Sequence, residues 1–298
     1  LRGVVAMDGG LDGHPEFDAW RDAQPATDPQ LLLAPDADVV QLYTSGTTGH
    51  PKGVQLTTAN YLAFFHSAER AEWADFRPGE VNLACMPVFH VAGLNMGIIT
   101  IAQGSTSVVM KEVDPHQILD FIPRYRINNA FFVPAVLLFM LQHPKIGETD
   151  LSSLQRLYYG ASPIAEDLLV RAKAVFRCKF FQPYGLKETV GGGTCLPDEA
   201  HDPALGKLRA CGKPYPGIEI RVVDDAGRDC AAGAVGEVVI RSGLVMKGYW
   251  QRPDATAAAI RDGWFYTGDA GIMVGPRSLK IVGRVDEHRL SGPFAPHH

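Results

Sequence analysis

The sequence has no excess of basic residues, no apolar run of membrane-spanning length and few cysteines. Its 298 residues include 28 Lys and Arg against 33 Asp and Glu, which gives a formal net charge of −5. Nucleic-acid-binding domains present a positive surface to the phosphates, so this balance argues against a nucleic-acid partner.

The longest apolar stretch, Ala130 to Leu141, is interrupted by Pro134. A membrane-spanning helix needs about twenty apolar residues. We therefore expect a core segment here and no transmembrane segment, which leaves peripheral membrane contact open. Leu1 to Gly13 also lacks the apolar run of a signal peptide. Because the sequence does not begin with Met, we expect a fragment of a longer protein.

The five cysteines form no Cys-x-x-Cys pair, and their odd number leaves at least one without an intramolecular partner. Disulfides persist mainly in oxidising compartments. The cysteine content therefore predicts reduced thiols and a cytoplasmic location.

Hydrophobic residues make up 46% of the chain and charged residues 20%, as in packed globular proteins. A buried strand is expected at Asp38–Thr44, and further strands at Gly53–Leu56, Val81–Met86, Thr106–Met110, Ala130–Val133 and Leu154–Tyr159. Helices are expected at Pro115–Tyr125, Pro134–Gln142 and Ala165–Phe176. Another helix, capped by Thr57 or Thr58, is expected to place Leu62 and Phe65 on its inner face.

This alternation predicts an α/β fold in which parallel sheet layers are flanked by helices. From about residue 205 the pattern changes to short β-type runs such as Glu219–Val223 and Glu237–Arg241, separated by turn residues. Such runs predict a small antiparallel β subdomain.

Residues 43–53, Tyr-Thr-Ser-Gly-Thr-Thr-Gly-His-Pro-Lys-Gly, combine three glycines, four Ser or Thr hydroxyls and Lys52. Glycines let the backbone approach an anion, hydroxyls donate hydrogen bonds, and the lysine adds a mobile positive charge. The segment therefore predicts a polyphosphate cradle. It differs from a Walker A loop because Lys52 precedes a strand rather than a helix. A plain Gly/Ser/Thr hairpin is the alternative.

This segment resembles the signature of the adenylate-forming superfamily, which comprises acyl-CoA synthetases, peptide-synthetase adenylation domains and luciferases. Further motifs follow in the order of that family: Phe89–Gly93, Tyr159–Pro163, Gln182–Glu188 and Gly263–Asp269. The match is extended by Gly236–Val238, Gly248–Trp250 and Gly283–Arg284, so the resemblance runs from about Val39 to Gly292.

The resemblance implies that the loop holds the β- and γ-phosphates of ATP and that Glu188 coordinates Mg²⁺, an oxygen-preferring ion. A carboxylate must attack the α-phosphate, one anion approaching another, so cations and donors must surround the phosphates. The loop residues given this role are Thr44, Ser45, Gly46, Thr47, Thr48, Gly49 and Lys52. For Glu188 a surface carboxylate without a metal is the alternative.

For the nucleoside, the resemblance implies that Tyr184 offers an aromatic face to adenine, and that Asp269 and Arg284 hydrogen-bond to the ribose. The remaining contacts implied are at Gly160, Ala161, Ser162 and Gly185. A core tyrosine and a loop-stabilising aspartate are the alternatives for Tyr184 and Asp269.

On the acid side, His90 is implied to line the passage where the acyl carboxylate meets the thiol, a structural histidine being the alternative. The glycines at 191–193 predict a roomy or long acyl channel, which favours a fatty or bulky acid. Lys187 stands where the family usually has Thr. A lysine can still neutralise charge there, but it lacks the acceptor capacity of a hydroxyl, so its effect on activity is open.

We divide the chain into a leader segment (1–36), an α/β ATP-binding subdomain (37–204), a β-rich subdomain with the ribose-binding turn (205–284), and a hinge remnant and tail (285–298). Glu287 aligns imperfectly with the hinge position of the family. The family's C-terminal lid domain is expected to be absent from this chain.

The sequence thus predicts a ligase of the acyl-CoA synthetase type, which uses ATP and Mg²⁺ to convert a carboxylic acid to acyl-AMP. CoA is expected to react only with the C-terminal domain present, so the chain alone is expected to be weak or inactive. An adenylation domain that loads a carrier-protein thiol is one alternative. A catalytically silent nucleotide-binding module, favoured by Lys187, is the other.

Overall fold

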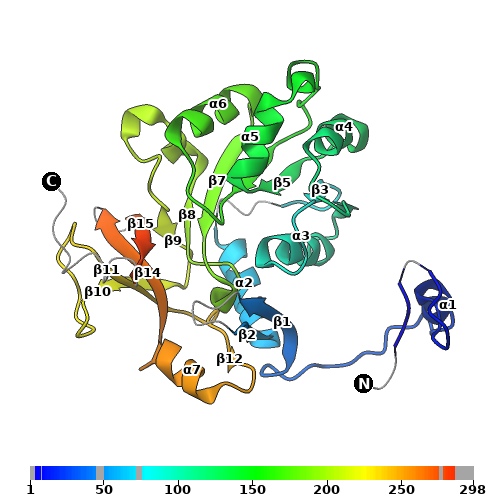
Figure 1. Cartoon of the computed structure of the whole chain (residues 1–298), viewed down its shortest axis with the longest axis horizontal. Coiled ribbons are helices and arrows are strands. Elements are labelled where there is room, and N and C mark those ends of the chain that lie inside the picture. The colour runs from blue at the N-terminus through cyan, green and yellow to red at the C-terminus, as the bar shows by residue number, and fades with distance from the viewer. Residues whose placement is uncertain (1–3, 8, 45–49, 72–75, 275–277, 286–298) are drawn as a thin grey trace. The chain divides into compact units, whose positions relative to one another are not determined.

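The computed structural model describes residues 4–7, 9–44, 50–71, 76–274 and 278–285, and it has two compact units, Leu1–Ala34 and Pro35–His298. The first unit holds one short helix, α1 (Phe17–Asp22), which buries none of its residues. The other helices and strands belong to the second unit (Figure 1).

The largest sheet has seven strands in the order β4-β3-β5-β6-β7-β8-β9. The strands from β4 to β7 pair in parallel, and β8 and β9 extend the sheet antiparallel. Their bounds are β3 (Val81–Ala84), β4 (Thr106–Val109), β5 (Asn129–Phe132), β6 (Arg156–Tyr159), β7 (Lys179–Tyr184), β8 (Thr194–Leu196) and β9 (Lys213–Pro214). The predicted parallel sheet is confirmed.

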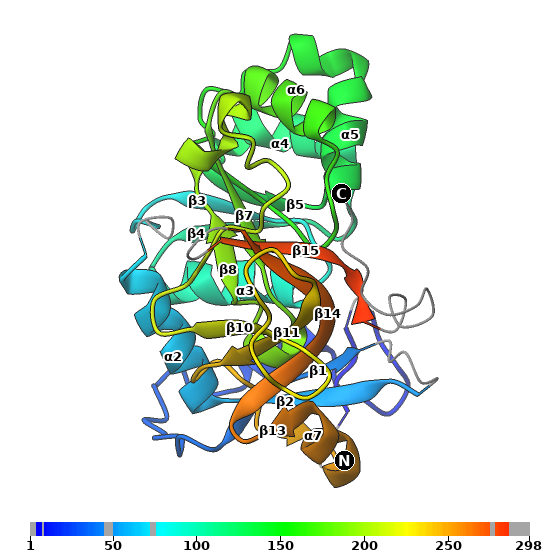
Figure 2. The ribbon, with the colours of Figure 1, turned by 90° about the vertical axis from the view of Figure 1, so that its left-hand side faces the viewer.

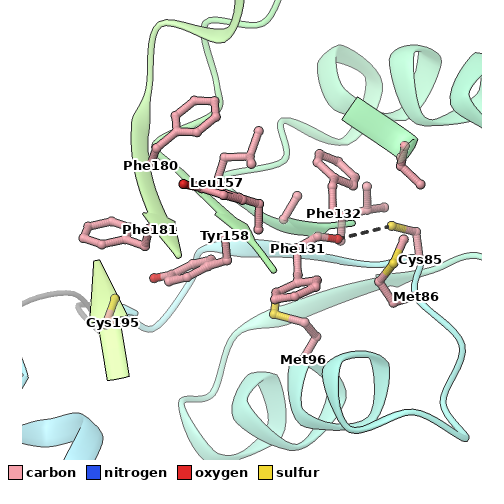
Figure 3. Close-up of a cluster of buried hydrophobic side chains, with 14 of the residues drawn as sticks. Cys85, Met86, Met96, Phe131, Phe132, Leu157, Tyr158, Phe180, Phe181 and Cys195 are labelled. Carbon is pink, nitrogen blue, oxygen red and sulfur yellow. Dashed lines mark hydrogen bonds between the residues drawn. The ribbon is translucent and has the colours of Figure 1, made fainter. Parts of the chain in front are cut away.

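Helices cover both faces of this sheet, with α4, α5 and α6 on one face and α3 on the other (Figure 1; Figure 2). They are α3 (Val91–Ala102), α4 (Pro115–Tyr125), α5 (Pro134–Gln142) and α6 (Glu166–Phe176). Because both faces are covered, β5 and β6 bury all their residues. Figure 3 shows the resulting aromatic cluster, in which Tyr158 and Phe181 stack with ring centroids 5.4 Å apart.

Two smaller sheets are antiparallel, and the five-stranded one confirms the antiparallel strands predicted after residue 205. A three-stranded sheet has the order β1-β2-β12, and a five-stranded sheet has the order β10-β11-β14-β13 with β15 paired to β14. The bounds are β1 (Asp38–Thr44), β2 (Lys52–Thr57), β12 (Gly248–Tyr249), β10 (Glu219–Val223), β11 (Gly236–Arg241), β13 (Ile260–Arg261), β14 (Trp264–Val274) and β15 (Ser278–Arg284).

Shorter elements complete the second unit. These are the helices α2 (Thr58–Glu69) and α7 (Pro253–Ala259), with the 3₁₀ turns η2 (Pro144–Gly147), η3 (Lys187–Thr189), η4 (Asp198–His201) and η5 (Pro203–Leu205). The predicted capping of α2 is confirmed: the Thr57 side chain accepts a hydrogen bond from the backbone N–H of Asn60.

Two local predictions are wrong. β1 is an edge strand that buries only Leu42, although its apolar run predicts a buried strand. In α2 the buried aromatic residues are Tyr61 and Phe64, whereas Leu62 is exposed. Apolar residues are spread around this helix, so their spacing did not define one inner face.

A buried ion pair connects the amino ends of β3, β5 and β6. Arg156 donates to Oε1 of Glu80 at 3.0 Å, and each side chain is less than a tenth exposed. Asn129 donates to the other oxygen of Glu80 at 2.9 Å and to Oδ1 of Asn82 at 2.8 Å. The buried polar groups at the amino ends of these strands therefore hydrogen-bond to one another.

Replacing Arg156 with Leu is expected to lower the free energy of unfolding by about 3 kcal/mol, because Glu80 then becomes a buried, uncompensated charge. Chemical denaturation measures the loss. The control is Arg209→Leu, which removes an exposed ion pair with Glu166 and should cost less than about 1 kcal/mol. Equal losses in the two variants would contradict the importance of burial.

Candidate nucleotide-binding site

A cavity of about 790 Å³ lies where β6 and β7 end. The carboxyl ends of parallel strands are where α/β sheets bind ligands. The residues predicted to contact the nucleotide that line this cavity are Gly160, Ala161, Ser162, Tyr184, Gly185, Asp269 and Arg284. The fold thus brings together loops from β6 and β7 and side chains from β14 and β15.

Gly160, which directly follows β6, permits a close approach of two loops. A Cβ atom there would lie 2.7 Å from the carbonyl oxygen of Pro183, so any side chain would push the loops apart. Ala161 follows with a φ of +66°, in the left-handed region that side chains rarely adopt. The predicted backbone contacts at 160 and 161 therefore depend on an unusual local conformation.

Asp269 is held between two of the predicted nucleotide residues. The Tyr184 hydroxyl donates to Oδ2 of Asp269 at 2.8 Å, and Arg284 donates to Oδ1 at 2.5 Å. Burial, and then the charge of Asp269, raise the pKa of Tyr184 well above its ordinary value, so the hydroxyl stays protonated. Each carboxylate oxygen keeps a further lone pair for a ligand hydroxyl.

The turn that carries Asp269 is fixed by side chains of the turn and of β11. Thr267 donates from Oγ1 to the carbonyl of Val238 at 2.8 Å, and Glu237 accepts from the backbone N–H of Gly268 at 3.0 Å. A Cβ at Gly268 would lie 2.6 Å from Nη2 of Arg284. Sequence analysis assigned no role to Glu237, although it lies in the Gly236–Val238 motif.

Lys52 and Glu188 both contact the side chain of Tyr249. Nζ of Lys52, on β2, lies 5.1 Å from the ring centroid of Tyr249, and the Tyr249 hydroxyl donates to Oε1 of Glu188 at 2.9 Å. Glu188 is buried, on the turn η3 that begins two residues after Gly185. The alternative of a surface carboxylate is therefore wrong for Glu188, whose metal role stays a prediction.

Lys187, the residue that departs from the family motif, donates from Nζ to the backbone carbonyl of Tyr43 at 2.9 Å. Tyr43 and Thr44 end β1 immediately before the predicted phosphate loop. The predicted loop residues Ser45, Gly46, Thr47, Thr48 and Gly49, and the hinge-aligned Glu287, lie outside the described residues.

His90 is the residue before α3 and is exposed. Partial burial of the ring and the nearby positive charge of Lys187 lower the pKa of His90 below its usual value. The imidazole is therefore neutral near pH 7. Its predicted role in the acyl passage is left as a prediction.

A smaller, apolar cavity of about 110 Å³ adjoins the first and shares Ala161, Pro183 and Gly185 with it. Its other walls are mainly aromatic and aliphatic side chains of α2, α3, β5 and β6. The predicted roomy channel at 191–193 is borne out only in that Gly191 lines this cavity, whereas the space beside Gly192 and Gly193 is filled by neighbours. A Cβ at Gly192 would lie 2.5 Å from Leu244, and one at Gly193 would lie 2.7 Å from the carbonyl of Tyr184.

Residues 4–250 match the family model described as AMP-binding enzyme. The chain belongs to this family. The fatty acid–[acyl-carrier-protein] ligase ScoC of Streptomyces coeruleorubidus is 42% identical over 260 residues, which cover 86% of this chain and 50% of ScoC. The medium/long-chain-fatty-acid–CoA ligase FadD8 of Mycobacterium tuberculosis is 36% identical over 270 residues, which cover 89% of this chain and 46% of FadD8.

Solved structures agree with the family assignment. The N-terminal domain of FACL13 from Mycobacterium tuberculosis superposes on this chain with a TM-score of 0.81 at 33% identity, covering 91% of this chain and 67% of that one. The chain spans about half the length of the curated relatives it matches. The predicted fold class and superfamily are confirmed. None of the helices in the described part of the chain could span a membrane.

A buried, neutral histidine, His201, contacts Tyr159 next to the nucleotide cavity. The hydroxyl of Tyr159, which precedes Gly160, lies 2.9 Å from Nε2 of His201, and Nδ1 of His201 lies 2.9 Å from the carbonyl of Pro197. A neutral ring satisfies both contacts by donating from Nδ1 and accepting at Nε2. Burial lowers the pKa of His201 to about 4.

Because the pKa of His201 is lower in the folded than in the unfolded state, the unfolded chain binds more protons as pH falls from about 6.5 to 4. The stability from this group is complete above that range, and about 2 kcal/mol of it should be lost between pH 7.5 and pH 5. Urea denaturation at the two pH values measures the loss. His201→Gln, which keeps a donor and an acceptor but does not titrate, should lose less; an identical pH dependence would contradict the prediction.

Proposed function

We propose that this chain is the ATP-binding part of a ligase that uses Mg²⁺ to activate a carboxylic acid as acyl-AMP with release of pyrophosphate and that, in the full-length enzyme, transfers the acyl group to CoA. The observation that carries the proposal is the 790 Å³ cavity, in which Asp269 is held between Tyr184 and Arg284. A carboxylate with spare lone pairs beside an aromatic residue suits a nucleoside, since it can accept from both ribose hydroxyls.

The charges near the phosphate loop suit the first half-reaction. The attacking carboxylate and the α-phosphate are both anionic, so the site must neutralise charge and hold the reactants in line. Lys52 is proposed to bind the leaving pyrophosphate. Lys187 is proposed to add positive charge near the α-phosphate, and His90, neutral near pH 7, to line the acyl passage without repelling an acid or a thiol.

Glu188 fits Mg²⁺ by its chemistry. It is a buried carboxylate, and among the described residues no three acidic, His or Cys side chains gather into a metal-binding cluster. Mg²⁺ is commonly held by one or two carboxylates together with substrate phosphates and water, so one protein carboxylate is sufficient. When bound, the ion supplies charge neutralisation for the phosphates.

The apolar cavity is proposed to hold the acyl group. None of the described residues that line it is charged, which disfavours an amino acid with its α-ammonium. Aromatic rings of Phe64, Phe76, Phe131, Tyr158 and Tyr215 surround it, which favours a fatty or otherwise bulky apolar acid. FadD8 is a medium/long-chain-fatty-acid ligase by name.

A second acceptor has a specific observation behind it. ScoC, at 42% identity, is a fatty acid–[acyl-carrier-protein] ligase, so a carrier-protein thiol competes with CoA as the acceptor.

All five cysteines are free thiols in the structure, in keeping with the proposed cytoplasmic location.

Two substitutions separate the phosphate and nucleoside contacts. Lys52→Ala should weaken MgATP about tenfold or more, since a charge-assisted contact is lost, and leave AMP nearly unchanged. Asp269→Ala should weaken both nucleotides by about 1 to 3 kcal/mol. Calorimetric titration measures the four affinities. Equal loss of ATP and AMP in Lys52→Ala would remove Lys52 from the phosphate site.

Acid activation is tested by mass spectrometry of quenched reactions with ATP, Mg²⁺ and a panel of fatty, aromatic and amino acids. Acyl-AMP is expected with apolar acids, because the apolar cavity has no charged wall. CoA and a holo carrier protein are then offered in parallel to the full-length protein to identify the acceptor. Nucleotide binding without acyl-AMP from any acid would instead support the catalytically silent module.

A further inference from the structure

Tyr249, to which neither the sequence analysis nor the proposed function gives a role, is fixed by its backbone beside Lys52. Gly248 and Tyr249 of β12 pair with Gln55 and Val54 of β2. The backbone N–H of the next residue, Trp250, donates to the carbonyl of Gly53 at 2.7 Å. The ring of Tyr249 is therefore anchored to the strand on which Lys52 lies.

The edge of the ring carries a hydrogen-bond donor aimed at Glu188. The Tyr249 hydroxyl donates to Oε1 of Glu188 at 2.9 Å. An ionised carboxylate has no proton to give, so the hydroxyl of Tyr249 is the donor in this contact. A carboxylate held in this way keeps one orientation, and no described residue donates to its Oε2.

The face of the same ring carries Lys52. The 5.1 Å separation of Nζ from the ring centroid is within the range of a cation–π contact. Among the described residues Lys52 forms no ion pair with Glu188 or with another carboxylate. Both charged groups thus contact Tyr249 without forming an ion pair with each other.

We propose that Tyr249 is a positioning residue that holds the Glu188 carboxylate for Mg²⁺ and the Lys52 ammonium for the pyrophosphate of ATP. This role rests on the proposed function. Hydrogen bonds to metal-binding carboxylates fix their orientation, and their loss typically weakens metal binding 10- to 100-fold. The two halves of the role belong to different parts of one side chain, so two substitutions can separate them.

Tyr249→Phe keeps the ring under Lys52 and removes only the donor to Glu188. The Mg²⁺ concentration that gives half-maximal enhancement of ATP binding should rise about tenfold, while ATP affinity in EDTA and AMP affinity stay within about twofold of the unaltered chain. Tyr249→Leu should in addition weaken ATP in EDTA, because Lys52 loses its support. Calorimetry on the 298-residue chain measures all of these.

Tyr61→Phe is the matched control, since it removes another buried tyrosine hydroxyl, one that donates to Asn95. It should leave the Mg²⁺ dependence unchanged. An unchanged Mg²⁺ dependence in Tyr249→Phe, or equal losses of AMP and MgATP at an unchanged melting temperature, would overturn the role of Tyr249 alone. If the unaltered chain binds neither nucleotide, the proposed function fails, and this role fails with it.

Discussion

The shared carboxylate of Asp269 is the contact on which the candidate site depends. Tyr184 ends β7 of the seven-stranded sheet, whereas Asp269 and Arg284 lie on β14 and β15 of the five-stranded sheet. The hydrogen bond from Tyr184 thus joins the two sheets together with the backbone bonds of Leu279 to Cys211 and Gly212, and the ion pair joins the neighbouring strands β14 and β15. A largely buried carboxylate needs such partners, because an unpaired charge in that position would be costly. The nucleotide cavity is lined by the residues of this contact.

The polar groups at the two ends of the parallel strands differ in what they bind. At the amino ends, Glu80 and Arg156 bond to each other and to buried amides, so their polar groups are satisfied within the protein. At the carboxyl ends, Gly160 and Tyr184 border a cavity, and Asp269 keeps lone pairs for a ligand. The contacts at the amino ends can hold the strands in register. The loops at the carboxyl ends can then contact a ligand, as is usual for ligand sites in α/β sheets.

The charged side chains near the phosphate loop contact neutral groups. Lys52 lies against a ring, Lys187 against a backbone carbonyl, and Glu188 accepts from a hydroxyl. Each charged group therefore has a neutral partner in these contacts. Such partners orient a charge without cancelling it, which leaves electrostatic attraction for an incoming anion or cation.

The glycines at 191–193 drew attention as possible space for an acyl chain, but the structure requires two of them for close packing. In the structure Gly192 and Gly193 instead allow close contact with Leu244 and with the backbone of Tyr184, and the apolar cavity is small. An absent side chain in a sequence does not tell whether the space is left open or filled by a neighbour.

The sequence by itself determined the α/β class, the family and most strands and helices, because strand and helix periods and the glycine- and hydroxyl-rich loop are local properties of the chain. It missed α3, whose mostly apolar residues show no clear helical period, and it misplaced the inner face of α2. The partners of the site residues were decided by the tertiary structure alone. Tyr249 meets Lys52 and Glu188, and Glu237 meets Gly268, only because separate strands pair and pack, and no local pattern records contacts between residues so far apart in the chain.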